Sequence, residues 1–482
     1  MNRVSIKKLF FHFFSFLSLF LFCISICYGM KIDGLIHLHS QFSTGRNSLE
    51  EIVDKAKEKG IKAVLMTDHD VIKVEYGIPP FRNIFKKDYE LQSVTKRGAS
   101  EYIEEIEDIN KRRKNVVVIP GVESTAHYFW SGSIFNGNLT ANNWQKHILL
   151  VGFHSAEEID DLPVIHNGFS LRYVKELTPK ALFFLFAFIL SFLLYFTGEK
   201  FAKAFGLICS IISLLLIINY HPFQSTLFNQ YESNAGVIPY QELIDYANEK
   251  EILSIWAHPE SYKEREINGV RMLTPKYVED LLKTYNYTAF EGLYRDTATM
   301  IEAGKEWDIL LLDFIRKERN KPIWTVGGID YHGDEDEKID EVKTIFITDN
   351  LSKKSIIQAL KNGRCYAVRQ SNSGEIVIDE FLLSDKEQVN EAEMGESLKV
   401  SGEAILSVMI SEKYGKKEEA FLTIVRNGKI FIKKEIMLPF EKKFLFSAGS
   451  NDKGYFRLMV NFKDGGKAVS NPIFYNVSLD SK

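Results

Sequence analysis

The sequence predicts an α/β protein in which a parallel β-barrel is interrupted by an apolar helical hairpin and followed by an antiparallel β-sandwich. Short apolar strands alternate with helical stretches as far as about residue 370, which favours a parallel sheet. Two long apolar stretches near the middle of the chain are each long enough to cross a membrane. From about residue 375, alternating apolar residues without a long helix are typical of antiparallel strands.

The composition excludes some classes of function. The 482 residues suffice for two or three domains. The formal net charge is −4 and no basic block occurs, so a stable nucleic-acid complex is not expected. Three of the four cysteines (Cys23, Cys27 and Cys209) lie in apolar stretches, which leaves only Cys365 in a polar part of the chain. No disulfide framework is therefore implied.

Residues 1–29 are expected to form a signal peptide or an N-terminal membrane anchor. Three basic residues lie among the first eight, and an apolar run follows from Leu9 to about Tyr28. A run of this length permits a membrane span. The residues before Gly29 make a poor cleavage site, which favours the anchor.

Side chains that can bind metals follow the first two predicted strands. His37 and His39 end one apolar run, and Asp68 and His69 come directly after the run at residues 61–66. Because alternate residues of a strand point to the same face, we expect His37 and His39 to aim two imidazoles at one point. A histidine pair with a nearby carboxylate is a metal-ligand arrangement.

Later strand ends repeat this pattern. They supply Glu123, His147, His258, Asp330 and His332. In a parallel barrel, functional groups gather at the carboxyl ends of the strands. The repetition therefore predicts one metal centre built from distant parts of the chain.

One of these residues has a competitor. His127 lies four residues after Glu123 and is an alternative to His147 as a ligand. We prefer His147 because it opens the apolar strand at 147–152, whereas the surroundings of His127 are typical of a loop.

Helices are expected between the strands. The first has a capping box, with Ser48 as its N-cap and Glu51 three residues later, and Gly60 ends it. The other expected helices cover about residues 100–114, 237–250, 275–284 and 351–363. The turn Asn427-Gly428 lies in the predicted sandwich at 375–482 and indicates a hairpin there.

Residues 181–219 are expected to form a transmembrane helical hairpin, with spans at 181–197 and about 201–219. The metal motifs before and after it must meet in one barrel, which requires an even number of crossings. The basic amino terminus predicts that the catalytic part lies on the extracytoplasmic (periplasmic) side. Basic residues Arg172, Lys175 and Lys180 on the barrel side of the hairpin argue against this orientation.

Over about residues 33–370 the chain resembles the PHP (polymerase and histidinol phosphatase) superfamily. The resemblance rests on six motifs that occur in the order used by that superfamily: HLHS, TDHD, PGVE, HILLVG, AHPE and GGIDYH. The resemblance implies a distorted (β/α)7 barrel, in two parts at 30–165 and 235–370. It also implies two or three divalent metal ions and the hydrolysis of phosphoesters. Imidazole and carboxylate ligands suit Mn, Fe or Zn.

The resemblance also implies ligand roles. His37 and His39 would bind the first metal, and Glu123 would bridge it to a second. His147 and His258 would complete the second site.

The remaining motif residues complete the implied centre. Asp330 would be a further ligand of the first metal. Asp68 and His69 would be catalytic, serving a third site or the shared nucleophile alongside His332. Many relatives carry an acidic residue where this chain has Thr44, so the filling of a third site is open.

The resulting expectation is a membrane-anchored metal-dependent hydrolase. It would be a phosphoesterase that acts on phosphomonoesters or nucleotides through a metal-bound hydroxide. Arg46 and Arg295 could bind the substrate anion, although solvated arginines are an equal alternative.

The chain also resembles carbaryl-esterase-like PHP proteins, which allows carboxyl-ester or carbamate hydrolysis. A catalytically silent, membrane-proximal binding or scaffold module is a further alternative. The expected partners are a small-molecule ester and the membrane, and the sequence does not indicate an oligomeric state.

Overall fold

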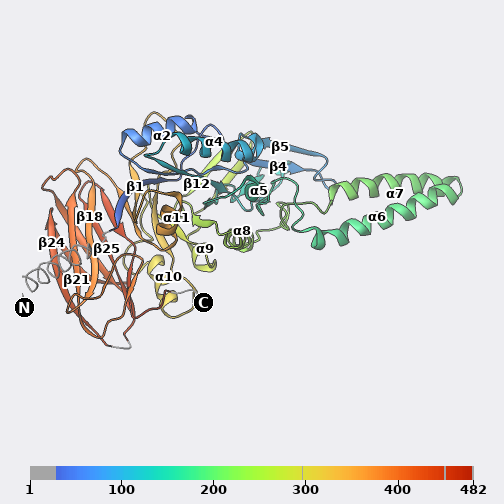
Figure 1. The fold of residues 1–482 in the computed structure, drawn as a ribbon. Helices are drawn as coiled ribbons and strands as arrows, with labels where there is room; N and C mark the ends of the chain where they lie inside the picture. The colour runs from blue at the N-terminus through green and yellow to red at the C-terminus, as the bar shows by residue number, and fades with distance from the viewer. Residues whose placement is uncertain (1–28, 296, 450–451, 480–482) are drawn as a thin grey trace, which may run out of the picture.

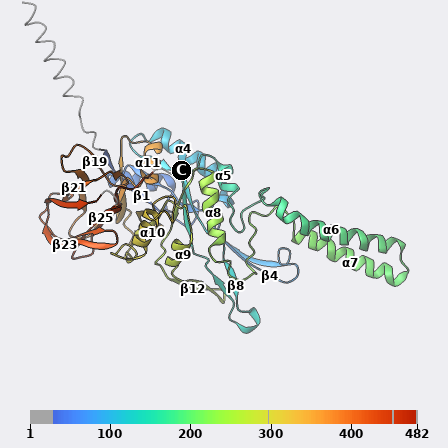
Figure 2. The ribbon, with the colours of Figure 1, turned by 90° about the horizontal axis from the view of Figure 1, so that it is seen from below.

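The fold, taken from a computed structural model that describes residues 29–295, 297–449 and 452–479, is mixed α/β (Figure 1). The predicted N-terminal anchor lies outside these residues, apart from Gly29, and so do Cys23 and Cys27. The strand-rich C-terminal part forms one end of the molecule, and a long helical hairpin projects from the other end in both Figure 1 and Figure 2.

The largest sheet is mixed rather than wholly parallel. Strand β1 pairs in parallel with β2, and β2 pairs in parallel with β6, but β1 is antiparallel to β16 and β16 to β17. These strands are β1 (Met30–Ile36), β2 (Ala63–Leu65), β6 (Val117–Ile119), β16 (Val342–Thr348) and β17 (Cys365–Arg369). The sheet therefore departs from the expectation of parallel strands only.

A second, six-stranded sheet carries most of the metal motifs. Its order is β15-β14-β11-β10-β7-β3, with parallel and antiparallel pairs. The strands are β3 (Asp68–His69), β7 (Gly121–Ser124), β10 (Ile148–Val151), β11 (Leu253–Trp256), β14 (Ala289–Tyr294) and β15 (Trp324–Gly328). Most residues of these strands are buried, so one continuous apolar core holds both sheets together.

Helices pack around these sheets. The larger ones are α2 (Leu49–Glu58), α4 (Ala99–Arg112), α8 (Ile238–Glu249), α9 (Val278–Lys283), α10 (Glu306–Ile315) and α11 (Lys353–Lys361). The short ones are α3 (Val94–Arg97), α5 (Ala156–Asp160) and the 3-10 turn η1 (Ile134–Asn136). The predicted capping box is confirmed, because the Ser48 amide donates to the Glu51 carboxylate and the Glu51 amide to the Ser48 hydroxyl. Helix α10 was not predicted.

Three strand pairs that were not predicted extend from this core. They are β4 (Lys73–Gly77) with β5 (Lys86–Glu90), β8 (Phe129–Ser131) with β9 (Thr140–Asn142), and β12 (Lys263–Ile267) with β13 (Val270–Thr274). The last two pairs join through β9 and β13 and have a small apolar cluster of their own.

The C-terminal strands do not form an isolated sheet. Strand β26 pairs with β17, so the largest sheet continues through β26, β25 and β27, with β22 and β23 attached. A four-stranded sheet, β19-β18-β21-β24, accompanies it. The bounds are β18 (Ile376–Asp385), β19 (Glu391–Ala392), β20 (Ser397–Leu398), β21 (Gly402–Glu412), β22 (Glu419–Arg426), β23 (Lys429–Met437), β24 (Phe440–Ala448), β25 (Gly454–Phe462), β26 (Lys467–Ser470) and β27 (Ile473–Tyr475).

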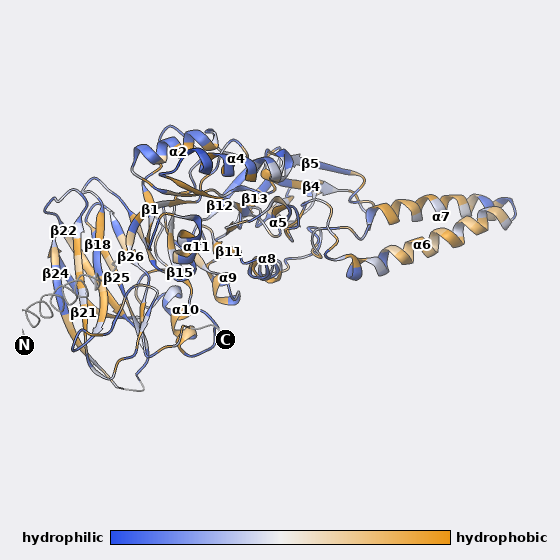
Figure 3. Cartoon of the chain, in the orientation of Figure 1, coloured by the Kyte–Doolittle hydropathy of each residue, from blue (hydrophilic) through white to orange (hydrophobic). Residues whose placement is uncertain are grey.

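The projecting hairpin consists of α6 (Val174–Thr197) and α7 (Lys200–Asn219). Helix α6 begins seven residues before the predicted span, and both helices are long and apolar enough to cross a membrane. Both helices are largely apolar (Figure 3), and most of their large apolar side chains are exposed. Small residues line the contact between them, because the Ser210 hydroxyl donates to Ser191 at 3.2 Å and a Cβ on Gly206 would lie 2.7 Å from the Tyr195 amide nitrogen. Close packing through small residues is characteristic of helix pairs in membranes.

Candidate metal centre

A single β-bridge brings the first and last metal motifs together. Leu38 pairs with Tyr331, since the His39 amide donates to the Tyr331 carbonyl at 2.9 Å and the Tyr331 amide to the His37 carbonyl at 3.0 Å. This bridge places His37 and His39 next to Asp330 and His332. The expected strand alternation is not the cause, because β1 ends at Ile36 and His37 has a φ of 71°.

Glu123 lies at the centre of the cluster. Its two carboxylate oxygens lie 2.5–3.3 Å from ring nitrogens of His37, His39, His69, His147 and His258. One oxygen, Oε1, faces His37, His147 and His258, and the other, Oε2, faces His39 and His69. The carboxylate thus lies between two groups of imidazoles, as a bridging ligand would.

Asp330 adds a second carboxylate. Its Oδ1 lies 3.3 Å from His37 Nε2 and 3.2 Å from His39 Nε2, and His332 stacks on the His39 ring. Three sets of side chains could each hold an ion: His37, His39, Glu123 and Asp330; His69, Glu123 and His147; and His39, His69 and His332. Two ligands about 2.1 Å from one tetrahedral ion lie about 3.4 Å apart, close to these separations.

The Nε2 atom of His37 shows that the cluster fits an ion. It is buried and has no hydrogen-bond partner among the described residues, although it lies 3.1 Å from Glu123 Oε1. Buried polar atoms without a partner are rare in folded proteins. A divalent ion between His37, Glu123 and Asp330 would satisfy this nitrogen.

Burial and charge oppose each other at these residues. Burial disfavours the charged carboxylate of Glu123, but the neighbouring histidines, His147 foremost, outweigh it and hold its pKa well below the ordinary value. Burial also lowers the pKa of His37, but Glu291 and Glu123 outweigh this and raise that pKa well above its ordinary value. A cation entering beside His37 would therefore displace a proton from this imidazole.

The cluster opens on one side. His37 and His39 are fully buried, whereas the side chains of His69 and His332 are 12% and 27% exposed. The set that contains these two exposed rings has three imidazoles and no carboxylate. Thr44, in the position where many relatives have an acid, has a buried Oγ1 without a hydrogen-bond partner in the described part of the chain.

Asp68 does not join any of the three sets. Its Oδ1 accepts hydrogen bonds from the Ser40 amide and the Ser43 hydroxyl, both at 2.7 Å, and its Oδ2 accepts one from the Ser40 hydroxyl at 2.8 Å. These three hydrogen bonds connect the Asp68 carboxylate to the loop after His39.

The alternative ligand His127 also lies outside the three sets, whereas His147 belongs to one of them. The His127 ring is buried, and neither of its nitrogens has a partner among the residues described. The preference for His147 thus agrees with the geometry.

Arg46 and Arg295, the two candidates for binding a substrate anion, lie beside the loop that follows His332. Arg46 is paired with Asp334 at 2.8 Å, and Arg295 with Glu337 at 3.2 Å. A substrate anion would have to compete with these carboxylates for either guanidinium.

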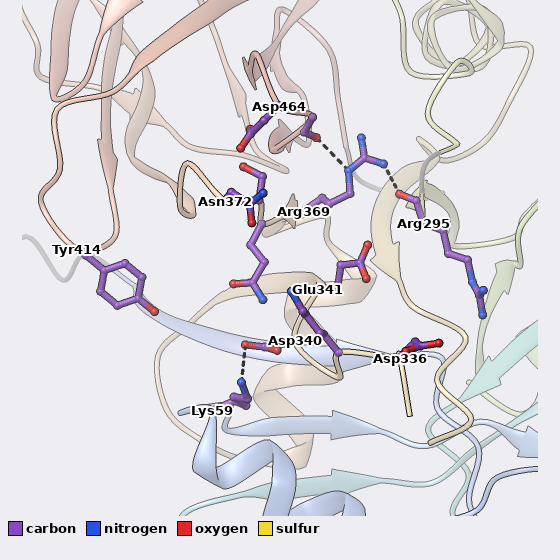
Figure 4. A pocket seen from close by; sticks show the side chains of 13 residues that line it. Lys59, Arg295, Asp336, Asp340, Glu341, Arg369, Asn372, Tyr414 and Asp464 are labelled. Atoms are coloured by element: carbon purple, nitrogen blue, oxygen red, sulfur yellow. Dashed lines mark hydrogen bonds and ion pairs between the residues drawn. The ribbon is translucent and has the colours of Figure 1, made fainter. Parts of the chain in front are cut away.

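A cavity of about 840 Å³ lies next to Arg295, between this loop, β17 and the C-terminal strands (Figure 4). Acidic and basic side chains both line it, among them Lys59, Asp336, Asp340 and Asp464. None of the nine candidate ligands, all within the described residues, contributes to its wall. The cavity is therefore separate from the metal cluster.

Sequence reasoning missed the residues that hold the ligands in place. Glu291 of β14 accepts from His37 Nδ1 at 2.7 Å and from the His258 amide at 2.6 Å. Tyr277 contacts His258 Nδ1 at 3.0 Å, and Tyr294 donates to Asp330 at 2.7 Å. A charged residue inside an otherwise apolar strand was the available signal for Glu291.

The Glu291→Gln variant should show a metal affinity or an activity about 10–100-fold lower than the wild type. Residues that hydrogen-bond to a metal ligand orient it and fix the histidine tautomer, and glutamine would weaken this hold on His37. Metal titration of the purified variant beside the exposed Glu266→Gln control would measure this. Equal affinities for the two variants would contradict a role for Glu291 in positioning His37.

The match to a family model agrees with the motifs. Residues 36–182 match the family model of the PHP domain. The chain is similar to a crystal structure of a two-domain protein from Bacteroides vulgatus ATCC 8482, which contains a predicted PHP-like metal-dependent phosphoesterase. The identity is 11% and the TM-score 0.37, and the alignment covers 92% of this chain and 95% of that chain. No curated protein matched. This match supports a PHP domain at residues 36–182, a range that includes His37, His39 and Glu123.

Proposed function

We propose that this protein is a membrane-anchored, metal-dependent phosphoesterase that acts on phosphomonoesters or nucleotides. The observation that supports this most directly is the Glu123 carboxylate, which lies between ring nitrogens of five histidines. A carboxylate between two imidazole groups matches a bridged pair of divalent ions better than a structural ion pair.

The candidate ligands are assigned to two proposed metal positions and to a third at the open side of the cluster. His37, His39 and Asp330 would hold one ion, His147 and His258 another, with Glu123 between them. His69 and His332 lie at the open side and are the candidates for a third. Mn, Fe or Zn in these positions would lower the pKa of a bound water and polarise a phosphoryl oxygen.

The chain's own side chains would prepare the site. Glu291 holds the His37 ring through Nδ1, which leaves Nε2 directed toward Glu123 and Asp330. Asp68, which is hydrogen-bonded to Ser40 and Ser43, and His69 are the candidates for proton transfer, with His69 in that role only where the third position holds no ion. Arg46 and Arg295 stand at the rim as candidates for binding a substrate anion.

The hairpin of α6 and α7 is proposed as the membrane anchor. Its outward side chains are large and apolar, including Phe186 at 61% and Phe205 at 62% exposed. A monomeric soluble protein rarely exposes so large an apolar surface. The proposed orientation places the metal centre on the extracytoplasmic side.

Elemental analysis of the detergent-purified protein tests the metal centre. The wild type should carry two or three equivalents of transition metal, and His37→Ala/His39→Ala should carry fewer. The exposed pair His154→Ala/His221→Ala is the matched control and should keep the full content. A metal-free wild type, even after Mn or Zn is supplied, would favour a binding or scaffold module instead.

A substrate panel tests the reaction. The metal-loaded protein would be assayed with a phosphomonoester, a nucleotide, a carboxyl ester and a carbamate. Preference for the phosphoesters supports the proposal. Turnover of only the carboxyl ester or carbamate would replace it with the carboxyl-ester hydrolase alternative.

A further inference from the structure

The β4–β5 hairpin reaches the base of the α6–α7 pair (Figures 1 and 2). Asn83 in its connecting loop donates from its amide to the Asn219 side chain and from its side chain to the Asn219 carbonyl, both at 2.8 Å. Asn219 is the last residue of α7 and is 2% exposed. The loop at residues 78–85 therefore lies level with the end of this apolar helix.

Two further contacts hold the loop in that position. The Arg82 guanidinium lies 4.1 Å from the centre of the Tyr231 ring, and the Gly77 amide donates to the Tyr231 hydroxyl at 2.6 Å. A Cβ on Gly77 would lie 1.9 Å from the Arg82 carbonyl oxygen, so only glycine permits this close turn. The loop is thus attached to the segment that leaves α7.

The apolar side chains of this loop are turned outward. Ile78 is 63% and Phe85 is 53% exposed, beside the exposed Lys87 and beside Lys86, which is paired with Glu75 at 2.6 Å. Folding gains nothing from leaving two large apolar side chains in water. Their exposure next to basic residues matches a surface that meets headgroups and the outer acyl region of a bilayer.

The segments just before α6 and just after α7 also expose apolar side chains near a basic residue. Phe169 and Leu171 are both 67% exposed, and Phe169 stacks on Phe223 with ring centres 4.7 Å apart. Nearby, Lys180 lies over the Tyr220 ring at 3.8 Å. Aromatic rings and long basic side chains at the ends of apolar helices are typical of the membrane interface.

We propose that these five exposed side chains form an interfacial collar, which inserts into the headgroup region of the bilayer that α6 and α7 cross. The collar consists of Ile78, Phe85, Phe169, Leu171 and Phe223. The inference rests on the proposed anchoring by the hairpin, and it adds a second attachment. A hairpin alone leaves the rest of the protein free to tilt, whereas a collar at its base holds the metal centre in one orientation to the membrane.

Fluorescence quenching in reconstituted vesicles tests the collar. The full-length Phe85→Trp variant would be placed in vesicles of phosphatidylcholine and phosphatidylglycerol with bromine on the acyl chains near the headgroup. The indole added at position 85 should lose most of its emission, after subtraction of the wild-type signal. Tyr414→Trp, at a more accessible position (72% against 53% exposed) in the C-terminal part, should lose none.

A third variant separates the collar from the anchor. In Leu190→Trp the new indole lies on the outer face of α6, where Leu190 is 52% exposed. Quenching at 190 with none at 85 would overturn the collar and leave the anchor standing. A blue-shifted but unquenched indole at position 85 would show that protein, such as a second copy of the chain, covers the collar instead. No quenching at 190 would overturn the anchor and the collar together.

Discussion

Replacing Glu123 by glutamine is expected to abolish most of the proposed hydrolytic activity. Glutamine keeps the shape of the side chain but removes the charge that lies between five imidazoles. Losing only an outer partner of a metal ligand costs about 10–100-fold, so losing the bridging carboxylate should cost more than about 100-fold. Turnover of a phosphomonoester and metal content, measured on the same sample, would test this.

The control for this variant is Glu101→Gln. Glu101 lies on the outer face of α4 with its side chain 53% exposed, and its replacement should leave both measurements unchanged. Glu123→Gln that kept full activity and full metal content would rule out the bridged centre as the site of hydrolysis.

Replacing Asp308 by alanine is expected to produce the largest loss of stability. Asp308 of α10 accepts from Arg457 Nε and Nη2 of β25, each at 2.7 Å, and from the Tyr455 hydroxyl at 2.5 Å. Arg457 is 0% exposed, so the variant would leave a buried charge without its partner. Such a loss costs about 3–5 kcal/mol. Urea unfolding followed by tryptophan fluorescence would report it, because Trp307 lies 4.8 Å from the guanidinium.

Two further variants make this prediction specific. Lys386→Met breaks an exposed ion pair with Glu403 and should not move the unfolding midpoint, since such pairs contribute little. The double variant Asp308→Leu/Arg457→Met removes both charges and should recover most of the lost stability. If Asp308→Ala unfolded like the wild type, the contact between α10 and β25 would not stabilise the fold.

Local signals in the sequence predicted much of the fold. The capping box of Ser48 and Glu51 determines where α2 begins, because both hydrogen bonds join residues three positions apart. The two helices of the hairpin follow in the same way from the apolar composition of residues 181–197 and about 201–219. The turn at Asn427-Gly428 also depends on its own backbone, where both residues have positive φ.

The candidate site was only partly predictable. His37, His39, Glu123 and Asp330 carried recognisable motifs at strand ends, and the structure brings their ligand atoms within 4.8 Å of one another. The hydrogen bonds from Ser40 and Ser43 to the Asp68 carboxylate could not be read from its motif, and the catalytic role expected for Asp68 stays a prediction.

The amino-acid sequence by itself determined the local elements and the residue types available for a metal centre, because both depend on near neighbours along the chain. Only the tertiary structure decided how they meet. Glu291 lies 254 positions from His37, and no local pattern pairs them. The pairing of β17 with β26 likewise merges the C-terminal strands with the sheet that contains β1. Contacts of this kind form only when burial of apolar surface brings distant segments together, and the buried polar groups then have to find partners.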